Sequence, residues 1–503
     1  MQTVVGIDLG TQHLKVVCYD FEARQLVATG SAPLELMQND SGVAEQRAQW
    51  WLDALRDVFS KIDRQILASV IAIGVSGQQH GFVPLDTSGR VLADVKLWCD
   101  TSTERECQEI MASVGGADAC IDLTGNPILS GYTASKILWF RKTHPGLYAK
   151  MATILLPHDY LNFYLTGERC MEAGDASGTG LLDIRKRQWS TEILRAIDPE
   201  RDLRDCLPVL RTQPGAIGTL SKQTAKALGM PATTLVATGG GDNMMAAIGT
   251  GNVSQGRLTM SLGTSGTVYA HSDTPVVDPD GDIAGFCSST GGWLPLLCTL
   301  NCTVATETMR RMLDTDLMDF EQHVSRANPG SDGIITLPFY NGERSPNLPA
   351  GKACIIGLDN QNSRSENLLR SAMEGASYAL RFGIDRLKGL GIETDGIVLT
   401  GGGANSATWR QLTADVCAAP VTILQQKEGA AFGAALQALA ILTGANIEGV
   451  VSEHLSRDEA FSCEPDPRAV DFYQDAYEGY QRAVSAVTPY LQQAPTGKQE
   501  AMP

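Results

Sequence analysis

The same short turn stands near the start of each half of the chain, between two runs of strand-forming residues. The turns are Leu9-Gly10-Thr11 and Leu262-Gly263-Thr264. Their flanking runs are Val4–Ile7 and Leu14–Tyr19 in the first half, and Leu258–Ser261 and Val268–Ala270 in the second. Three matching residues are a weak repeat, but their equivalent positions favour an internal duplication. The sequence therefore predicts two β-hairpins that open two related halves.

The length of the chain and the order of its elements predict a two-domain α/β protein. At 503 residues the chain exceeds what one hydrophobic core usually serves. A helix over about residues 47–62 and a strand over Val70–Val75 follow the first hairpin, which is the order typical of α/β domains. We expect an N-terminal domain over 1–248 and a C-terminal domain over 249–503, with a final helix near 470–487 and a frayed tail at about 492–503.

Charge and cysteine usage exclude several classes of partner. A net charge of -17 argues against binding nucleic acid or an anionic membrane surface, although backbone N–H groups can still hold a phosphate. The twelve cysteines are irregularly spaced and form no CxxC pair, which is typical of reduced thiols. The start of the chain lacks the pattern of a secretion signal, and no apolar run is long enough to cross a bilayer. We therefore expect a cytoplasmic protein.

The two Leu-Gly-Thr turns suit the binding of phosphate groups. Glycine lets the backbone come close to a ligand, and threonine adds a hydroxyl, so Gly10-Thr11 and Gly263-Thr264 are candidates for the phosphates of ATP. Asp8 precedes the first turn, where a carboxylate can hold Mg²⁺ directly or through water. Either turn alone is more often an ordinary hairpin turn, but two copies with one acidic residue favour the phosphate interpretation.

A run of three glycines leads into a second acidic residue. In Gly239-Gly240-Gly241-Asp242-Asn243, the glycines allow close approach of the backbone to a ligand, and Asp242 stands where a helix is expected to begin. Asp242 is therefore a candidate general base that takes a proton from an attacking hydroxyl. The alternative is an ordinary helix cap after a glycine linker, and these residues alone do not decide between the two.

Further polar and glycine-rich segments suit a nucleoside and a polyol. The segment 401–406, Gly-Gly-Gly-Ala-Asn-Ser, can form a floor beneath a nucleoside. Gln79 and His80 offer amide and imidazole groups to a polyol, and Trp98 with Asp100 adds an apolar face and a carboxylate. Taken singly, the ordinary interpretations are stronger: His80 and Trp98 as core residues, and Asp100 as a loop cap.

Together these segments resemble the FGGY family of carbohydrate kinases. The resemblance spans about Val4 to Gly444 and includes two longer stretches, Tyr132–Trp139 and 353–374. It implies two actin-like (ribonuclease H-like) α/β domains with an active-site cleft between them. It also implies a role for each matching position: Asp242 as the base; Asp8 near the metal; Gly10, Thr11, Gly263 and Thr264 at the phosphates; Gly402, Gly403 and Asn405 on the adenosine side; Gln79, His80, Trp98, Asp100 and Asn243 at the sugar.

The activity implied by the resemblance is transfer of the γ-phosphoryl of ATP, with Mg²⁺, to the terminal hydroxyl of a ketopentose. D-xylulose is the expected substrate, and L-ribulose, gluconate and glycerol are the alternatives, because the fold and the base do not choose the sugar. A nucleotide switch of the actin or Hsp70 kind, or a silent sugar sensor, would use the same phosphate turns. A homodimer is expected because dimers are common in the family.

Overall fold

The computed structural model describes residues 2–349 and 351–493, which fall into two compact units. The first unit takes the described residues of Met1–Ser254 with His271–Pro295 and Glu428–Leu455. The second takes those of Gln255–Ala270, Leu296–Lys427 and Ser456–Pro503. Each unit is thus built from separate stretches of chain, and a single division of the sequence at residue 248 stays a prediction.

The first unit is built on a seven-stranded sheet in the order β14-β15-β6-β1-β2-β3, with β16 also paired to β6. Its strands are β1 (Thr3–Leu9), β2 (His13–Asp20), β3 (Gln25–Pro33), β6 (Val70–Gly77), β14 (Ala216–Thr219), β15 (Leu235–Ala237) and β16 (Gly240–Gly241). β1 runs antiparallel to β2 and parallel to β6, so the predicted hairpin and third strand are confirmed. The predicted helix is α1 (Ala48–Ser60), which buries one apolar face.

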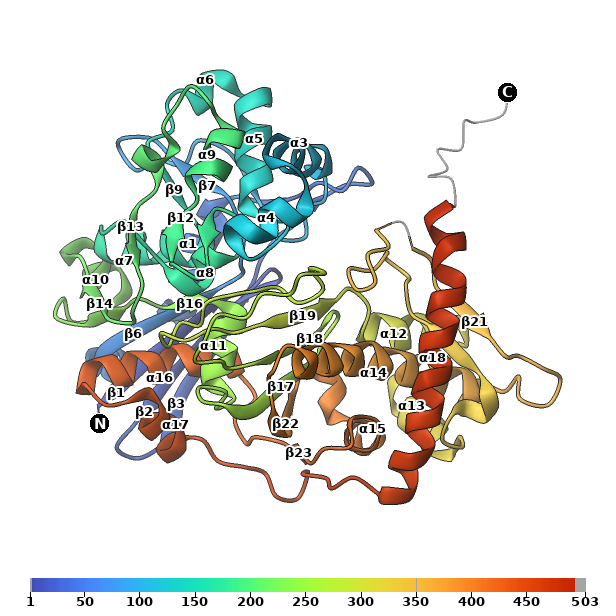
Figure 1. Cartoon of the computed structure of the whole chain (residues 1–503). Helices are drawn as coiled ribbons and strands as arrows, with labels where there is room; N and C mark the ends of the chain where they lie inside the picture. The colour runs from blue at the N-terminus through green and yellow to red at the C-terminus, as the bar shows by residue number, and fades with distance from the viewer. Residues whose placement is uncertain (1, 350, 494–503) are drawn as a thin grey trace. The chain divides into compact units, whose positions relative to one another are not determined.

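The other elements of the first unit are short strands and helices, of which α3, α4, α5, α6 and α9 lie together apart from this sheet, around a separate hydrophobic cluster (Figure 1). The strands are β4 (Met37–Gln38), β5 (Ala44–Gln46), β7 (Val83–Leu85), β8 (Val95–Lys96), β9 (Thr153–Leu155), β10 (Cys170–Glu172), β11 (Leu182–Asp183), β12 (Gln188–Trp189) and β13 (Val209–Arg211). The helices are α2 (Arg64–Ala68), α3 (Glu104–Val114), α4 (Ala117–Thr124), α5 (Thr133–Thr143), α6 (Pro145–Tyr148), α7 (Pro157–Thr166), α8 (Ala173–Ser177), α9 (Thr191–Ile197), η1 (Leu203–Cys206), α10 (Lys222–Leu228), α11 (Asp242–Gly249), α16 (Gly429–Thr443) and α17 (Ile447–His454).

Helix α16 lies against β1 and β6 although it comes from the far end of the sequence (Figure 1). The approach is close because β1 carries Gly6, where a Cβ atom would lie 1.7 Å from the Ala431 carbonyl oxygen. The opposite side of α16 meets α11 equally closely, since a Cβ at Gly433 would lie 1.8 Å from the Met245 oxygen. Small residues in α16 therefore place the start of α11 beside the carboxyl ends of the central strands.

The second unit repeats the hairpin arrangement in a five-stranded sheet, in the order β19-β18-β17-β22-β23. Its strands are β17 (Gly256–Leu262), β18 (Gly266–Ala270), β19 (Leu296–Thr299), β22 (Thr394–Thr400) and β23 (Val421–Thr422), with a separate pair β20 (Ile335–Leu337) and β21 (Cys354–Ile356). Its helices are α12 (Thr303–Met312), α13 (Leu317–Arg326), η2 (Ser331–Gly333), α14 (Ser365–Gly389), η3 (Gly402–Asn405), α15 (Ala407–Cys417) and α18 (Pro467–Gln493).

The predicted final helix is α18, which is held to α14 by aromatic residues. Tyr473, Tyr477 and Tyr480 are buried, and their rings surround Tyr378 of α14 at centroid distances of 5.3–6.4 Å. Of the tail predicted at 492–503, residues 492 and 493 belong to α18 and the rest lie outside the described residues. Within residues 2–349 and 351–493, no helix combines the length and apolar character needed to span a membrane.

Candidate active site

Three neighbouring strands of the first unit end at one edge of the sheet, and the predicted acidic residues lie there. β6 is parallel to both β1 and β16, with Asp8 and Gly240 each in register with Ser76. Asp242 follows directly after β16 as the first residue of α11. The carboxyl ends of parallel strands are where α/β proteins place their ligands. The topology thus brings together Asp8, Asp242 and the segment after β6 that contains Gln79 and His80.

The turn before β16 depends on glycine. Gly239 has φ +67°, and a Cβ there would lie 2.1 Å from the Val75 carbonyl oxygen. No other residue type fits this left-handed turn against the backbone of β6. The predicted glycine run therefore does bring the backbone close to a neighbour, and that neighbour is the central strand. Its effect is to fix the position of Asp242.

Asp242 has the electrostatics expected of a general base. Its side chain is partly exposed, but the surrounding protein raises its pKa to about 7, first by desolvation and second by the charge of Asp8. The alternative of a helix cap is not what the structure shows, because Gly241 occupies the cap position of α11. A carboxylate with a pKa near neutrality can accept a proton under physiological conditions.

Asn243 holds the Asp242 carboxylate in one orientation, and Gln79 in turn holds the Asn243 amide. The Asn243 backbone N–H donates to Asp242 Oδ1 at 2.8 Å, and its Nδ2 donates to the same oxygen at 3.1 Å. Nδ2 also donates to Gln79 Oε1 at 3.0 Å. Of the residues predicted for the sugar, Asn243 is therefore joined directly to Asp242, and Gln79 is joined to it through Asn243.

His80 lies beside these groups in an unusual backbone conformation. Its φ is +64°, and its carbonyl oxygen accepts hydrogen bonds from Thr133 and Lys136. Its ring packs against Tyr132 at a centroid distance of 4.8 Å. Non-glycine residues with positive φ are uncommon and concentrate at functional sites. The ring is buried, its predicted contact with the sugar stays a prediction, and the positive φ is a feature that the sequence did not reveal.

Thr11 and Trp98 are hydrogen-bonded to each other. Trp98 Nε1 donates to Thr11 Oγ1 at 2.9 Å, and that hydroxyl donates to Gln78 Oε1 at 3.0 Å. The Thr11 hydroxyl therefore joins the first turn to the segment after β6. The Gly10 N–H already donates to the His13 oxygen at 3.0 Å, and a contact of Gly10-Thr11 with a phosphate stays a prediction.

Asp100 is enclosed by hydrogen-bond donors. Its side chain is fully buried, and its oxygens accept from the Ala44 N–H, Lys96 Nζ and both the N–H and hydroxyl of Ser102 at 2.6–3.0 Å. Such a carboxylate braces the loop after β8. The geometry favours the loop-cap interpretation over a contact with sugar.

The surroundings of Asp8 suit a magnesium ion. Asp8 is partly exposed and accepts one hydrogen bond from Ser76 Oγ at 2.8 Å, and burial raises the pKa of its carboxyl. Its charge also raises the pKa of Asp242, so a cation beside the two would be favourable. Among the described residues, no group of three or more His, Cys, Asp or Glu could hold a metal. Magnesium fits this donor set because it usually takes one or two carboxylates plus water and phosphate oxygens.

The second unit gathers its own predicted residues around the second turn. The carbonyls of Gly263 and Thr264 accept hydrogen bonds from the first residues of α12 and its cap at 2.9 and 3.0 Å. Next to this turn, Gly401 has φ +88° and packs on the Leu262 backbone. Gly402 is exposed, and a Cβ there would meet no atom within 4 Å. Asn405 Nδ2 donates to the Gly402 oxygen at 3.1 Å, which stabilises this short turn.

A group of buried titratable residues near Asp242 was not predicted from the sequence. His158 Nδ1 lies 2.7 Å from Asp175 Oδ2, and Asp175 contributes to the raised pKa of Asp242. Burial raises the pKa of the nearby Glu172 to about 7. A signal was present, because Glu172 and Asp175 interrupt a run of small and apolar residues. No spacing rule connects that run to Asp242.

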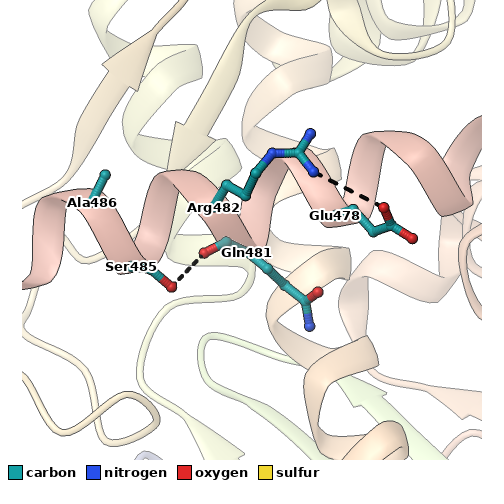
Figure 2. Close-up of a pocket in the computed structure, with 5 residues that line it drawn as sticks. All are labelled: Glu478, Gln481, Arg482, Ser485 and Ala486. Atoms are coloured by element: carbon teal, nitrogen blue, oxygen red, sulfur yellow. Dashed lines mark hydrogen bonds and ion pairs between the residues drawn. The ribbon is translucent and has the colours of Figure 1, made fainter.

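A hollow in the second unit contains none of these residues. It runs along α18 and is lined by Glu478, Gln481, Arg482, Ser485 and Ala486 (Figure 2). Its lining comes from one helix surface and holds a single ion pair and no convergent polar groups. The carboxyl edge of the first sheet is the stronger candidate.

Comparison with known proteins agrees with this geometry. Models of the N-terminal and C-terminal domains of the FGGY family of carbohydrate kinases match residues 3–249 and 258–442. The chain is 42% identical to a xylulose kinase of Haemophilus influenzae, over 95% of this chain and 98% of that protein. A solved structure named as a xyloylose kinase from Brucella ovis superimposes with a TM-score of 0.90 at 29% identity, covering 97% of this chain and 100% of the other.

A gluconate kinase from Lactobacillus acidophilus has the same fold, with a TM-score of 0.90 at 23% identity over 98% of this chain and 99% of that one. The fold and the family matches show an α/β carbohydrate kinase, as predicted, and the roles of the residues at the carboxyl edge stay predictions. The chain belongs to the FGGY family of carbohydrate kinases.

Proposed function

We propose that the protein phosphorylates D-xylulose at the expense of ATP and yields D-xylulose 5-phosphate and ADP. The observation that carries the proposal is the group of Asp242, Asn243 and Gln79, in which Asn243 donates two hydrogen bonds to a carboxylate with a pKa near 7 and a third to Gln79. The choice of sugar rests on the relatives, because the xylulose kinase of Haemophilus influenzae matches almost the full chain at 42% identity.

The reaction needs one proton acceptor and an in-line hydroxyl. The sugar oxygen forms a bond to the γ-phosphorus as the bond from that phosphorus to the bridging oxygen of ADP breaks. Asp242 accepts the hydroxyl proton, and its raised pKa suits this task because a base works best with a pKa near the working pH. The amide of Asn243 keeps Asp242 Oδ1 fixed, which leaves Oδ2 for the proton.

We further propose that Asp8 holds Mg²⁺, which when bound neutralises charge on the phosphates. The partly exposed carboxylate and its small number of protein donors support this assignment. In the second unit, the exposed Gly402 leaves room for a nucleoside, with Gly403 and Asn405 beneath it and Gly263-Thr264 toward the phosphates.

Two secondary expectations belong to the same proposal. All twelve cysteines are free thiols among the described residues, which supports a reducing compartment such as the cytoplasm. A homodimer stays a prediction, to be checked by sedimentation analysis of the purified protein.

The test is ADP release by the purified protein with ATP and Mg²⁺, measured across D-xylulose, L-ribulose, D-ribulose, gluconate and glycerol. The proposal expects the highest kcat/KM with D-xylulose and identification of the product as the 5-phosphate. Preference for gluconate or another polyol would keep the kinase assignment and overturn the choice of sugar.

A further inference from the structure

Lys136 is a fully buried lysine whose ammonium group contacts two backbone carbonyls. It lies in the first turns of α5 and has no exposed surface. Its Nζ donates to the His80 oxygen at 2.8 Å and to the Gly131 oxygen at 2.6 Å. Burying an amine is unfavourable unless its donors are satisfied, and an apolar side chain would fill the space at lower cost. The lysine therefore needs a reason beyond filling the core.

The first carbonyl belongs to the residue with strained backbone. His80 has φ +64°, a conformation that an L-residue keeps only where its surroundings enforce it. Thr133 Oγ1 donates to the same His80 oxygen at 3.0 Å. Two side chains from the start of α5 thus hold the peptide after His80 and fix the backbone from which the imidazole extends.

The second carbonyl connects Lys136 to the Trp98 segment. Gly131 has φ +92°, and a Cβ there would lie 2.2 Å from the Trp98 carbonyl oxygen. Gly131 therefore packs directly on the backbone of Trp98, and Lys136 holds Gly131 in that place. One amine links the segments that carry two predicted sugar contacts.

We infer that Lys136 is a positioning residue for sugar binding, which acts by fixing the backbone of His80 and Gly131. The inference rests on the proposed function, since it assumes that His80 contacts the sugar. Burial lowers the pKa of Lys136 to about 7, but both its charged and its neutral form donate to carbonyls. Its effect is therefore tested by removing the donor.

Lys136→Met removes the donor and keeps the length of the side chain. We expect it to raise the Kd for D-xylulose, measured calorimetrically without ATP, by roughly tenfold or more, because a buried hydrogen bond to the carbonyl of a strained residue is lost. The KM for D-xylulose should rise in parallel, and the KM for ATP should stay within about twofold. A residue with a merely structural role would lower Tm and leave both sugar constants unchanged.

The matched control is Lys142→Met, the same substitution on the same helix. Lys142 pairs with Glu106 and Glu109 and does not bond to His80, so its sugar constants should equal those of the wild type. Thr133→Val provides a milder change at the same carbonyl and should raise the Kd by roughly threefold. If Lys136→Met does not fold, the Kd of Thr133→Val for D-xylulose tests the inference instead.

A folded Lys136→Met protein, or failing that Thr133→Val, with wild-type Kd and KM for sugar would overturn the inference alone. If the wild type prefers another polyol, the same constants are measured for that polyol, and the same shift is expected. Absence of any polyol binding or turnover by the wild type would overturn the proposed function together with this inference.

Discussion

The two hairpins of the molecule share a backbone and differ in their side chains. In the first unit β1 pairs antiparallel with β2 and parallel with β6, and in the second β17 pairs in the same ways with β18 and β22. A Leu-Gly-Thr turn follows β1 and β17 at equivalent places. The residues just before the Leu-Gly-Thr sequences differ: Asp8 in the first unit corresponds to Ser261 in the second.

The segments after the parallel strands differ in the same sense. β6 leads into Gln78, Gln79 and His80, which are buried polar residues, whereas β22 leads into Gly401–Gly403. At these strand ends the first unit thus carries acidic and hydrogen-bonding side chains, whereas the second unit has glycines that present only backbone groups. If the proposed roles hold, the shared backbone places the ligands, and side chains at a few positions separate catalysis in the first unit from nucleotide binding in the second.

The largest effect is expected at the base. Asp242→Asn keeps the shape of the side chain and removes the proton acceptor, so kcat with D-xylulose should fall by roughly 10²–10⁴-fold. The Kd for D-xylulose should change little. Asp40→Asn, an exposed acidic residue of the same unit, is the control and should retain wild-type kcat. Near-wild-type turnover in Asp242→Asn would remove Asp242 from its role.

The next effect comes from making the first turn like the second. Asp8→Ser should lower kcat by roughly 10²-fold and raise the Mg²⁺ concentration needed for half-maximal rate, because the metal loses its carboxylate. Ser261→Ala, at the matching place in the second unit, should change kcat by less than about threefold. Equal losses in the two variants would contradict the division of roles between the hairpins.

The glycines after β22 give a smaller and more selective effect. Gly402→Val points into open space and should raise the KM for ATP by roughly tenfold, with little change in Tm or in the KM for sugar. Gly403→Ala is the contrasting variant, because its Cβ would lie 2.7 Å from Leu262 Cβ. It should lower stability by about 1–3 kcal/mol. Steady-state kinetics and thermal denaturation measure both, and an unchanged KM for ATP in Gly402→Val would contradict the nucleoside assignment.

The smallest effect concerns stability against pH. The folded state raises the pKa of Asp242 from 3.8 to about 7, so it binds a proton that the unfolded state has released between these values. The free energy of unfolding of the protein therefore falls as pH rises from about 4 to about 7, because the folded state must then give up a proton that it holds more tightly than the unfolded state does. Asp242→Asn should be more stable than the wild type at pH 8, by on the order of 2 kcal/mol, and similar at pH 4.

The activity of the wild type should show the opposite dependence, since a base must be deprotonated. kcat/KM is expected to rise with pH through about 7. The stability prediction for Asp242 would be contradicted if denaturation at pH 8 showed Asp242→Asn to be less stable than the wild type, because the ionised carboxylate would then not destabilise the fold.

The sequence predicted the parts of the molecule that depend on local pattern. The two hairpins, α1 and the start of α11 follow from apolar periodicity and glycine turns, and all were found at the expected places. The edge that gathers Asp8 and Asp242 follows once β1, β6 and β16 are known to be parallel neighbours.

The parts that the sequence could not predict depend on contacts between distant residues. Asp100 was expected at the sugar, but it accepts from the Ala44 N–H 56 residues away and from a buried lysine. Lys136 lies in the stretch Tyr132–Trp139 that resembles the family, but the sequence assigned it no role because its partner His80 lies 56 residues earlier. α16 comes from the far end of the sequence, yet it packs on the first sheet. Patterns along the chain carry no information on such pairings.

In the proposed function, the group around Asp242 directs the phosphoryl group to a sugar hydroxyl and not to water. The direct measurement is the fate of the label from γ-³²P-ATP when wild-type protein is mixed with Mg²⁺, with and without D-xylulose. With D-xylulose, we expect the label to enter a sugar monophosphate, with one molecule of sugar phosphate for each ADP formed and little inorganic phosphate. Release of the label as inorganic phosphate at the same rate with and without sugar would contradict the proposed phosphorylation of a sugar and point to a nucleotide switch.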